Sequence, residues 1–245
     1  MPLITLTTAK SAMAGMNNNT NYTGARQSST SDYATLNTNS SNILAQNFYR
    51  NANRGAATFR FGRAFFAYDF TGYGTAAGTM TNLKWNFTGT NSSNSSTSTR
   101  LVKSSAFGSG VGSNYVSSNW WNSLTVGTTY NSTAAANSTW STGTSAQSWT
   151  LSSNATTAAQ TDGFLKFATM NALWDYSGIA PGLDVNQLSY LNNSLLVGIT
   201  RAKITFDWTP AATGWSGEIN SVSSSTIDDI NTKSRSSIAE INTVS

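Results

Sequence analysis

The chain has 245 residues and a formal net charge of +4, but only 10% of its residues are charged. Because Cys and His are both absent, the sequence excludes disulfides, thiolate or ordinary zinc sites, and any Ser-His or Cys-His catalytic relay. The basic residues are scattered rather than gathered in a dense stripe, and no segment approaches the roughly 20 apolar residues of a membrane span. We therefore expect no cofactor, no nucleic-acid partner and no membrane insertion.

The first 57 residues are polar and irregular. Runs of Asn, Thr and Ser at 17–21 and 37–42 are typical of loops. Two interpretations stay open for residues 1–57: the region is disordered, or it is an extended N-terminal arm that becomes ordered against neighbouring subunits. Residues 1–6 lack a basic segment followed by a sustained apolar run, so we expect no secretory signal.

Residues 58–210 show the pattern of an all-β fold. Short apolar runs, of which 63–70 and 83–87 are the clearest, recur between turns rich in Gly, Ser and Asn. Strands at this spacing predict an antiparallel β-sandwich. We expect no long helix, because Ser, Thr and Asn compete for backbone hydrogen bonds; only 188–192 is compatible with a helical turn. The other predicted strands are 58–61, 100–103, 123–129, 148–151, 163–170, 194–199 and 201–209.

Residues 211–245 form a tail with an eleven-residue repeat. The segment 218–223 (EINSVS) recurs as 229–234 (DINTKS) and as 240–245 (EINTVS). On a helix, eleven residues complete three turns and align the isoleucines, whereas the low helix propensity of Ser, Thr and Asn favours short turns stacked along a surface. In either conformation a narrow apolar stripe does not fold alone, so we predict that the tail docks on a partner. The candidate assembly contacts are Ile219, Ile227, Ile230, Ile238 and Ile241.

Two segments of the body resemble a known type of domain. Residues 63–70 (RAFFAYDF), followed by 80–87 (MTNLKWNF), resemble the paired-strand signature of carbohydrate-module-like jelly rolls of the DNRLRE type. In that type, an arginine-led apolar strand ending in Asp precedes a turn and a second, alternating strand. The resemblance covers about residues 58–210 and implies a jelly-roll sandwich, although Ser and Thr here replace the expected charged residues on the strand surfaces.

The tail resembles the short Ile-Asn-Gly-Val repeats at the ends of many structural proteins of tailed phages. The nearest comparison is with phages that infect aquatic bacteria, including cyanobacteria. Ser221, Thr232 and Thr243 stand where those repeats have Gly, the residue that most easily adopts a positive φ. The resemblance implies a structural component of a tailed-phage virion: a fibre, neck, tail or capsid-surface accessory. Such a component assembles with copies of itself, as an expected trimer, and with other virion proteins.

The principal alternative is a carbohydrate-binding module or adhesin that recognises host polysaccharide. Trp120, Trp121 and Trp140 are candidates for stacking on sugars, because aromatic rings suit the apolar face of a pyranose. The competing interpretation is that these side chains fill the core or a seam between subunits.

A polysaccharide-degrading enzyme is a third class. Only ten acidic residues are present, and four of them lie in the terminal repeat, so we predict that the chain is not an enzyme. Asp69, at the end of a predicted strand, is interpreted as a turn cap rather than a Ca²⁺ or sugar ligand. Asp175, in the segment 174–178, is also interpreted as a turn former.

Overall fold

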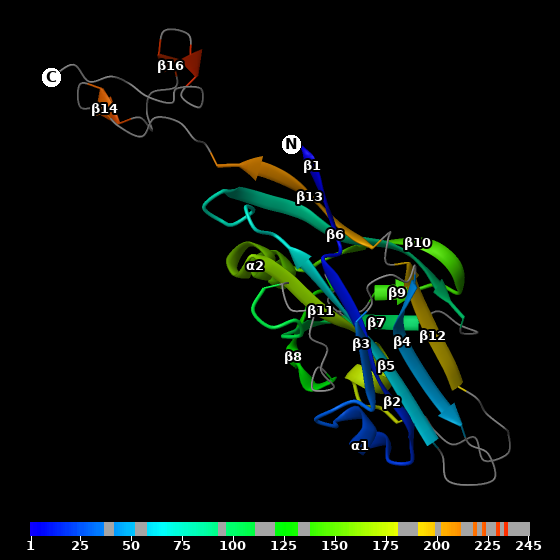
Figure 1. Ribbon diagram of the computed structural model, residues 1–245. Helices are drawn as coiled ribbons and strands as arrows, with labels where there is room; N and C mark the ends of the chain where they lie inside the picture. The colour runs from blue at the N-terminus through cyan, green and yellow to red at the C-terminus, as the bar shows by residue number, and fades with distance from the viewer. Residues whose placement is uncertain are drawn as a thin grey trace.

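Antiparallel β-strands make up most of the regular structure in the computed structural model (Figure 1). Strands β1 to β13 join in one sheet, and the tail adds two short hairpins. The structure describes residues 1–36, 42–51, 58–92, 97–110, 121–131, 138–180, 191–198 and 202–211, and the tail strands 218–219, 222–223, 229–230 and 233–234.

The strands match every region that the sequence predicts as β within 58–210, and others lie on both sides of it. They are β1 (Leu3–Thr7), β2 (Lys10–Asn19), β3 (Tyr33–Leu36), β4 (Asn42–Asn51), β5 (Thr58–Asp69), β6 (Gly78–Asn91), β7 (Thr97–Ser104), β8 (Leu124–Thr129), β9 (Ser138–Trp140), β10 (Gly143–Thr150), β11 (Phe164–Asn171), β12 (Leu191–Gly198), β13 (Lys203–Pro210), β14 (Glu218–Ile219), β15 (Val222–Ser223), β16 (Asp229–Ile230) and β17 (Lys233–Ser234).

The two longest strands, β5 and β6, organise the sheet into layers. One edge of β5 pairs with β2, and the other edge pairs first with β4 and then with β11. Likewise, one edge of β6 pairs with β10, and the other is shared by β13 and β12. In each long strand, one edge is shared by two partner strands. The sheet therefore separates into a β10–β6–β13–β1 layer and a β2–β5–β11–β7 layer, which are joined through β12 and β4. The predicted all-β antiparallel sandwich is confirmed; its jelly-roll connectivity stays a prediction.

An aromatic core fills the space between the layers. Trp85 of β6 packs edge-on against Phe66 of β5 and Phe167 of β11, each with ring centroids 5.2 Å apart. Phe87 and Trp149 extend this cluster along β6 and β10, with centroids 4.9 Å apart. Edge-to-face pairs of this kind stabilise the core beyond the burial of their area.

A second core covers the opposite face of β5. Phe61 and Phe65 point to this side and are buried, whereas the alternate residues Phe66 and Tyr68 belong to the first core. Small side chains of β2, the short helix α1 (Tyr22–Arg26) and Trp121 complete the second core. The continuous apolar run of β5 therefore reflects a strand that is buried on both faces.

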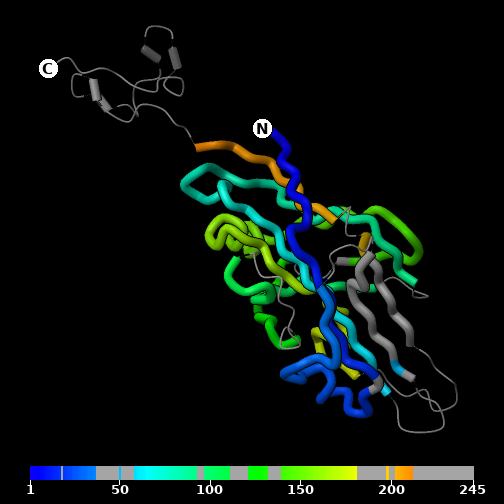
Figure 2. The backbone as a smooth tube through the Cα atoms, viewed as in Figure 1, coloured from blue at the N-terminus to red at the C-terminus, as the bar shows by residue number. Residues whose placement is uncertain are grey.

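The structure differs from the expectation for residues 1–57. The described part of this segment contributes β1, β2, β3 and β4 to the sheet, so it is not an arm separate from the body. Figure 2 shows the first strand beside the last strand of the sandwich, and these two strands pair from Leu3↔Asp207 to Thr7↔Lys203. The alternation of Ala12, Ala14 and Met16, all buried, is the pattern that indicates a strand here.

The sequence also fails to predict α2 (Ser153–Asp162), a helix of ten residues. Its buried residues Ala155, Ala158 and Ala159 form one face at helical spacing and pack on the aromatic core. Gly163 ends the helix in the left-handed conformation, with φ of 70°. The described part of the predicted turn at 188–192 is strand, in β12, and the rest lies outside the described residues.

A third helical segment, η2 (Ala172–Tyr176), is a single π-helical turn that follows β11. None of the helices in the described ranges has the length and apolar character needed to cross a bilayer.

Tyr68 links the two layers and the N-terminal segment by hydrogen bonds. Its fully buried hydroxyl accepts a hydrogen bond from Trp85 Nε1 at 2.8 Å and is hydrogen-bonded to the Thr8 hydroxyl at 3.1 Å. The Thr8 hydroxyl also donates to the carbonyl of Ala202 at 2.7 Å, just before β13. Burial raises the pKa of Tyr68 above its usual range.

We predict that stability falls in alkaline solution. Since the folded-state pKa of Tyr68 lies above the value near 10 of an unfolded tyrosine, its contribution is complete below about pH 10 and is lost as pH rises through the folded pKa. Burial also raises the pKa of Tyr22, to about 12. Urea unfolding between pH 7 and 11.5 measures the effect. Tyr68→Phe should be less stable at pH 7, because Trp85 loses its acceptor, yet show a shallower alkaline decline; equal slopes would contradict this account.

Candidate functional site

Trp121, a predicted sugar-stacking residue, is fully buried. Its ring lies under the guanidinium group of Arg63, whose Cζ atom is 3.7 Å from the ring centroid. Its Nε1 atom donates to the carbonyl of Ala25 at 3.2 Å. Because neither the ring face nor the indole N–H is open, the prediction that Trp121 stacks on a glycan is wrong; the residue is part of the second core.

Arg63 forms a buried ion pair with Asp175. Its Nε donates to Asp175 Oδ2 at 2.8 Å and its Nη2 to Oδ1 at 2.6 Å, with both side chains almost without solvent exposure. The guanidinium also donates to the carbonyls of Trp121 and Arg26, at 2.6 and 3.0 Å. The two-pronged geometry satisfies both charges. Asp175 does lie in a helical turn, as interpreted, but its carboxylate neutralises a buried cation.

Helix α1 closes over this ion pair. Asn21 caps the helix by accepting from Gly24 N at 2.9 Å. The hydroxyl of Tyr22 donates to the carbonyl of Trp174, and Arg26 Nη1 donates to the carbonyl of Asp175 at 3.1 Å. The ion pair and α1 therefore stabilise each other and bind the N-terminal segment to η2.

We predict that Asp175→Asn destabilises the fold by about 3–5 kcal/mol, because it leaves the Arg63 charge buried without a counter-charge. Asp162→Asn is the matched control. Asp162 pairs with Lys103 at 3.4 Å in an exposed position, where an ion pair contributes at most about 1 kcal/mol. Guanidinium unfolding compares the two variants, and similar losses of stability would contradict the structural role of Asp175.

Trp140 also proves to be a core residue rather than a stacking platform. It is fully buried and packs edge-on against Phe87 and Trp149, with centroids 4.9 and 6.1 Å away. The prediction that Trp140 stacks on sugar is therefore wrong. The third candidate, Trp120, lies outside the described residues.

The described carboxylates of the body are engaged by separate donors. Asp69 accepts a hydrogen bond from Thr71 N at 2.8 Å, which confirms its role as a turn cap. Asp207 accepts from Asn82 Nδ2 at 2.6 Å. In the part of the chain that the structure describes, no three His, Cys, Asp or Glu side chains come together as a metal site.

The outward face of the β10–β6–β13–β1 layer is a polar surface that the strand registers define. The side chains alternate, so that Trp85 and Phe87 point into the core while their neighbours point out. Only Leu3 and Ala146 on this face are apolar. The outward residues are Thr144, Ala146, Ser148 and Thr150 on β10; Asn82, Lys84, Asn86, Thr88 and Thr90 on β6; Lys203, Thr205 and Asp207 on β13; and Leu3, Thr5 and Thr7 on β1.

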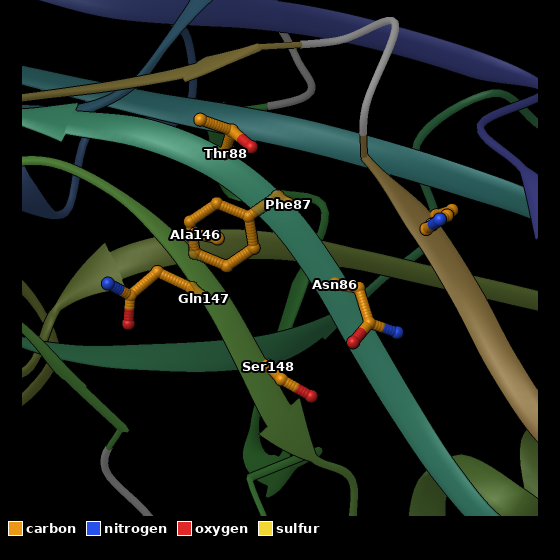
Figure 3. Close-up of a pocket in the computed structure, with 7 residues that line it drawn as sticks. Asn86, Phe87, Thr88, Ala146, Gln147 and Ser148 are labelled. Carbon is orange, nitrogen blue, oxygen red and sulfur yellow. The ribbon is translucent and has the colours of Figure 1, made fainter.

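Two open hollows lie on this polar face. The first, of about 470 Å³, lies over β6 and β10, as Figure 3 shows for Asn86, Thr88 and Ser148. The second, of about 520 Å³, extends toward β13 and β1. They share Asn86, Ser148 and Lys203, so they are continuous. An open surface of amides and hydroxyls binds by hydrogen bonding rather than by enclosing an apolar ligand.

Cross-strand hydrogen bonds fix the side chains of this face. Asn86 Nδ2 donates to the Thr205 hydroxyl at 2.8 Å, from β6 to β13. The hydroxyls of Thr90 and Thr144 lie 2.7 Å apart, from β6 to β10. The sequence does not reveal this face, because single outward Thr and Asn residues in a strand carry no mark of function.

The tail strands form two equivalent hairpins. In the first, Glu218 pairs with Ser223 and Ile219 with Val222. In the second, eleven positions later, Asp229 pairs with Ser234 and Ile230 with Lys233. Of the predicted contacts, Ile219 and Ile230 lie in these strands, whereas Ile227, Ile238 and Ile241 lie outside the described residues.

Comparison with protein families, curated proteins and solved structures found no match to this chain. The resemblances to jelly rolls and to phage repeats therefore stay predictions that rest on the residues that carry them.

Proposed function

We propose that the chain is a non-catalytic structural component of a tailed-phage virion, and that its C-terminal tail docks it to copies of itself and to other virion proteins. The observation that carries this proposal is the pair of equivalent hairpins in the tail. Their strands are only two residues long, and even longer isolated hairpins are barely stable in water. Such hairpins require a surface to pack on.

The body supports the same proposal by its chemistry. Its aromatic side chains fill two cores, and its outward β10–β6–β13–β1 face is built mainly of uncharged hydroxyl and amide side chains. Surfaces of this kind suit close packing between neighbouring copies, because few charges have to be desolvated. The likeness of the tail to phage repeats supplies the virion context.

The mechanism of assembly is mutual burial. Holding the tail in one conformation costs conformational entropy of the backbone and side chains. For the backbone, the free-energy cost is about 1–2 kcal/mol per residue. Apolar surface buried between subunits offsets this cost at about 25 cal/mol per Å². Because the hairpins repeat, each makes an equivalent contact, and closed symmetry allows all copies to satisfy the same contacts.

We predict that deletion of residues 216–245 leaves a folded body that no longer assembles. Sedimentation velocity should show the full chain as an oligomer and the truncated chain as a monomer, with an unchanged thermal midpoint and near-UV circular dichroism. A full-length variant with Ile219→Ser, Ile230→Ser and Ile241→Ser keeps the length of the tail and should behave like the truncated chain. An oligomer of unchanged size in both variants would contradict docking through the tail.

The virion context has its own test. Mass spectrometry of purified particles from a phage that encodes this chain should detect it in a fixed ratio to the other structural proteins. Its absence from particles, together with its presence in the lysate, would contradict the virion proposal even if the chain self-assembles.

A further inference from the structure

We infer that β1 pairs with β1 of a second copy, antiparallel and about a two-fold axis, so that the β10–β6–β13–β1 layer continues from one body into the next. The inference rests on the proposed self-assembly, because docking of the tails brings two bodies close enough for short edge strands to meet. It names the surface on which the bodies join. An assembly that contains this contact has an even number of copies, unlike the expected trimer.

The outer edge of β1 is open. The strand pairs with β13 along its whole length without a register shift. Just before it, the carbonyl of Pro2 accepts a hydrogen bond from Trp208 N at 3.1 Å. Backbone groups of alternate residues point to opposite edges of an antiparallel strand, so the even-numbered residues bond to β13, whereas Leu3, Thr5 and Thr7 point away from it. In the part of the chain that the structure describes, no backbone hydrogen bond reaches this outer edge.

Nothing in β1 protects this edge against pairing. Proteins blunt exposed edges with charged side chains, prolines, bulges or very short strands. The sequence of β1, LITLT, contains neither a charge nor a proline. Other edge strands of the sheet differ: Asn131 bridges to Leu151 at the end of β10, the pairing of β8 with β7 has a register shift, and β3 has only four residues. The edge of β1 is therefore the one best prepared to accept another strand.

The outer face of β1 matches that of a second β1 when the two strands cross at Thr5. In this register Thr5 lies opposite Thr5 of the second copy, and Leu3 lies opposite Thr7. All the backbone groups that point away from β13 then find partners in the other strand. Cross-strand threonine pairs are favourable, and no like charges meet because β1 has none. Leu3, which is 67% exposed, gains a cross-strand neighbour.

The same register covers the apolar inner face of β1. Ile4 and Leu6 are half-buried and pack against the first core. In the two-fold pair, Ile4 lies opposite Leu6 of the second copy at a position without hydrogen bonds. Cα atoms at such positions are about 4.5 Å apart, which brings the side chains into close contact. Each copy therefore covers apolar surface that the other leaves exposed at the edge of its core.

Other strands fit this edge less well. Tail strands of a second copy would fill it incompletely, because each has two residues whereas β1 has five. A strand of another protein would satisfy the backbone groups, but it would also have to supply apolar side chains at both inner positions. A second β1 supplies them by symmetry.

Cysteine cross-linking of the full chain tests the pairing, because the sequence contains no Cys. Thr5→Cys should form a disulfide between copies under mild oxidation, since Cα atoms of a hydrogen-bonded pair lie about 5.5 Å apart. Leu3→Cys should form none, because its two copies lie about 14 Å apart along the strands. A mixture of Leu3→Cys and Thr7→Cys chains should cross-link, since these positions face each other.

Proline variants measure what the edge contributes to association. Thr5→Pro removes a donor that points away from β13, so the body should fold unchanged while half-dissociation of the oligomer moves to an at least tenfold higher concentration. Ala146→Pro is the matched control on the outer edge of β10. Its N–H points away from β6, because Leu151 N donates to the carbonyl of Leu83 at 2.9 Å and the register is continuous. This variant should associate like the unmodified chain.

The outcomes separate this inference from tail docking. An oligomeric full chain whose Thr5→Cys variant gives no disulfide would overturn the pairing of β1 and leave tail docking in place. Cross-linking of Leu3→Cys to the same extent as Thr5→Cys, or equal weakening by both proline variants, would also overturn it. A full chain that sediments as a monomer at every concentration would overturn both proposals.

Discussion

The burial of β5 on both faces is the constraint on which the rest of the structure depends. A strand with one exposed face needs to pack against other elements on one side only. In β5, Phe66 and Tyr68 point to one side and Phe61 and Phe65 to the other, so both faces have to be packed. The first side requires the layer built on β6. The second requires β2, α1 and Trp121, which explains why the N-terminal segment belongs to the body.

The same constraint explains the buried ion pair. Arg63 lies in the middle of β5, where no water is available to solvate its charge, so the fold brings Asp175 to it from η2. Because Trp121 and Trp140 are buried in the cores, neither ring is exposed to recognise a ligand. Hydroxyls and amides, together with Lys84, Lys203 and Asp207, remain on the outward face of the β10–β6–β13–β1 layer.

The sequence predicts the strands well because their patterns are local. Runs such as 83–87 alternate along a single strand, and continuous runs such as 63–70 mark a doubly buried one. It does not reveal the Arg63–Asp175 pair, because 112 positions separate the two residues, and it does not distinguish a core tryptophan from a surface one. It misses α2, whose buried face consists of alanines, and the polar face, which exists only after β6, β10 and β13 are aligned.

The body and the tail thus differ in what stabilises them. The body itself supplies the elements that pack on both faces of β5, whereas the tail hairpins have strands of only two residues, too short to be stable alone. Hydrogen–deuterium exchange of the full chain, measured by mass spectrometry across a dilution series, tests this difference directly. Amides of β5, β6 and β11 should be strongly protected at every concentration, and those of 218–234 only where the chain is assembled. Strong protection of 218–234 in the dilute monomer would contradict the account.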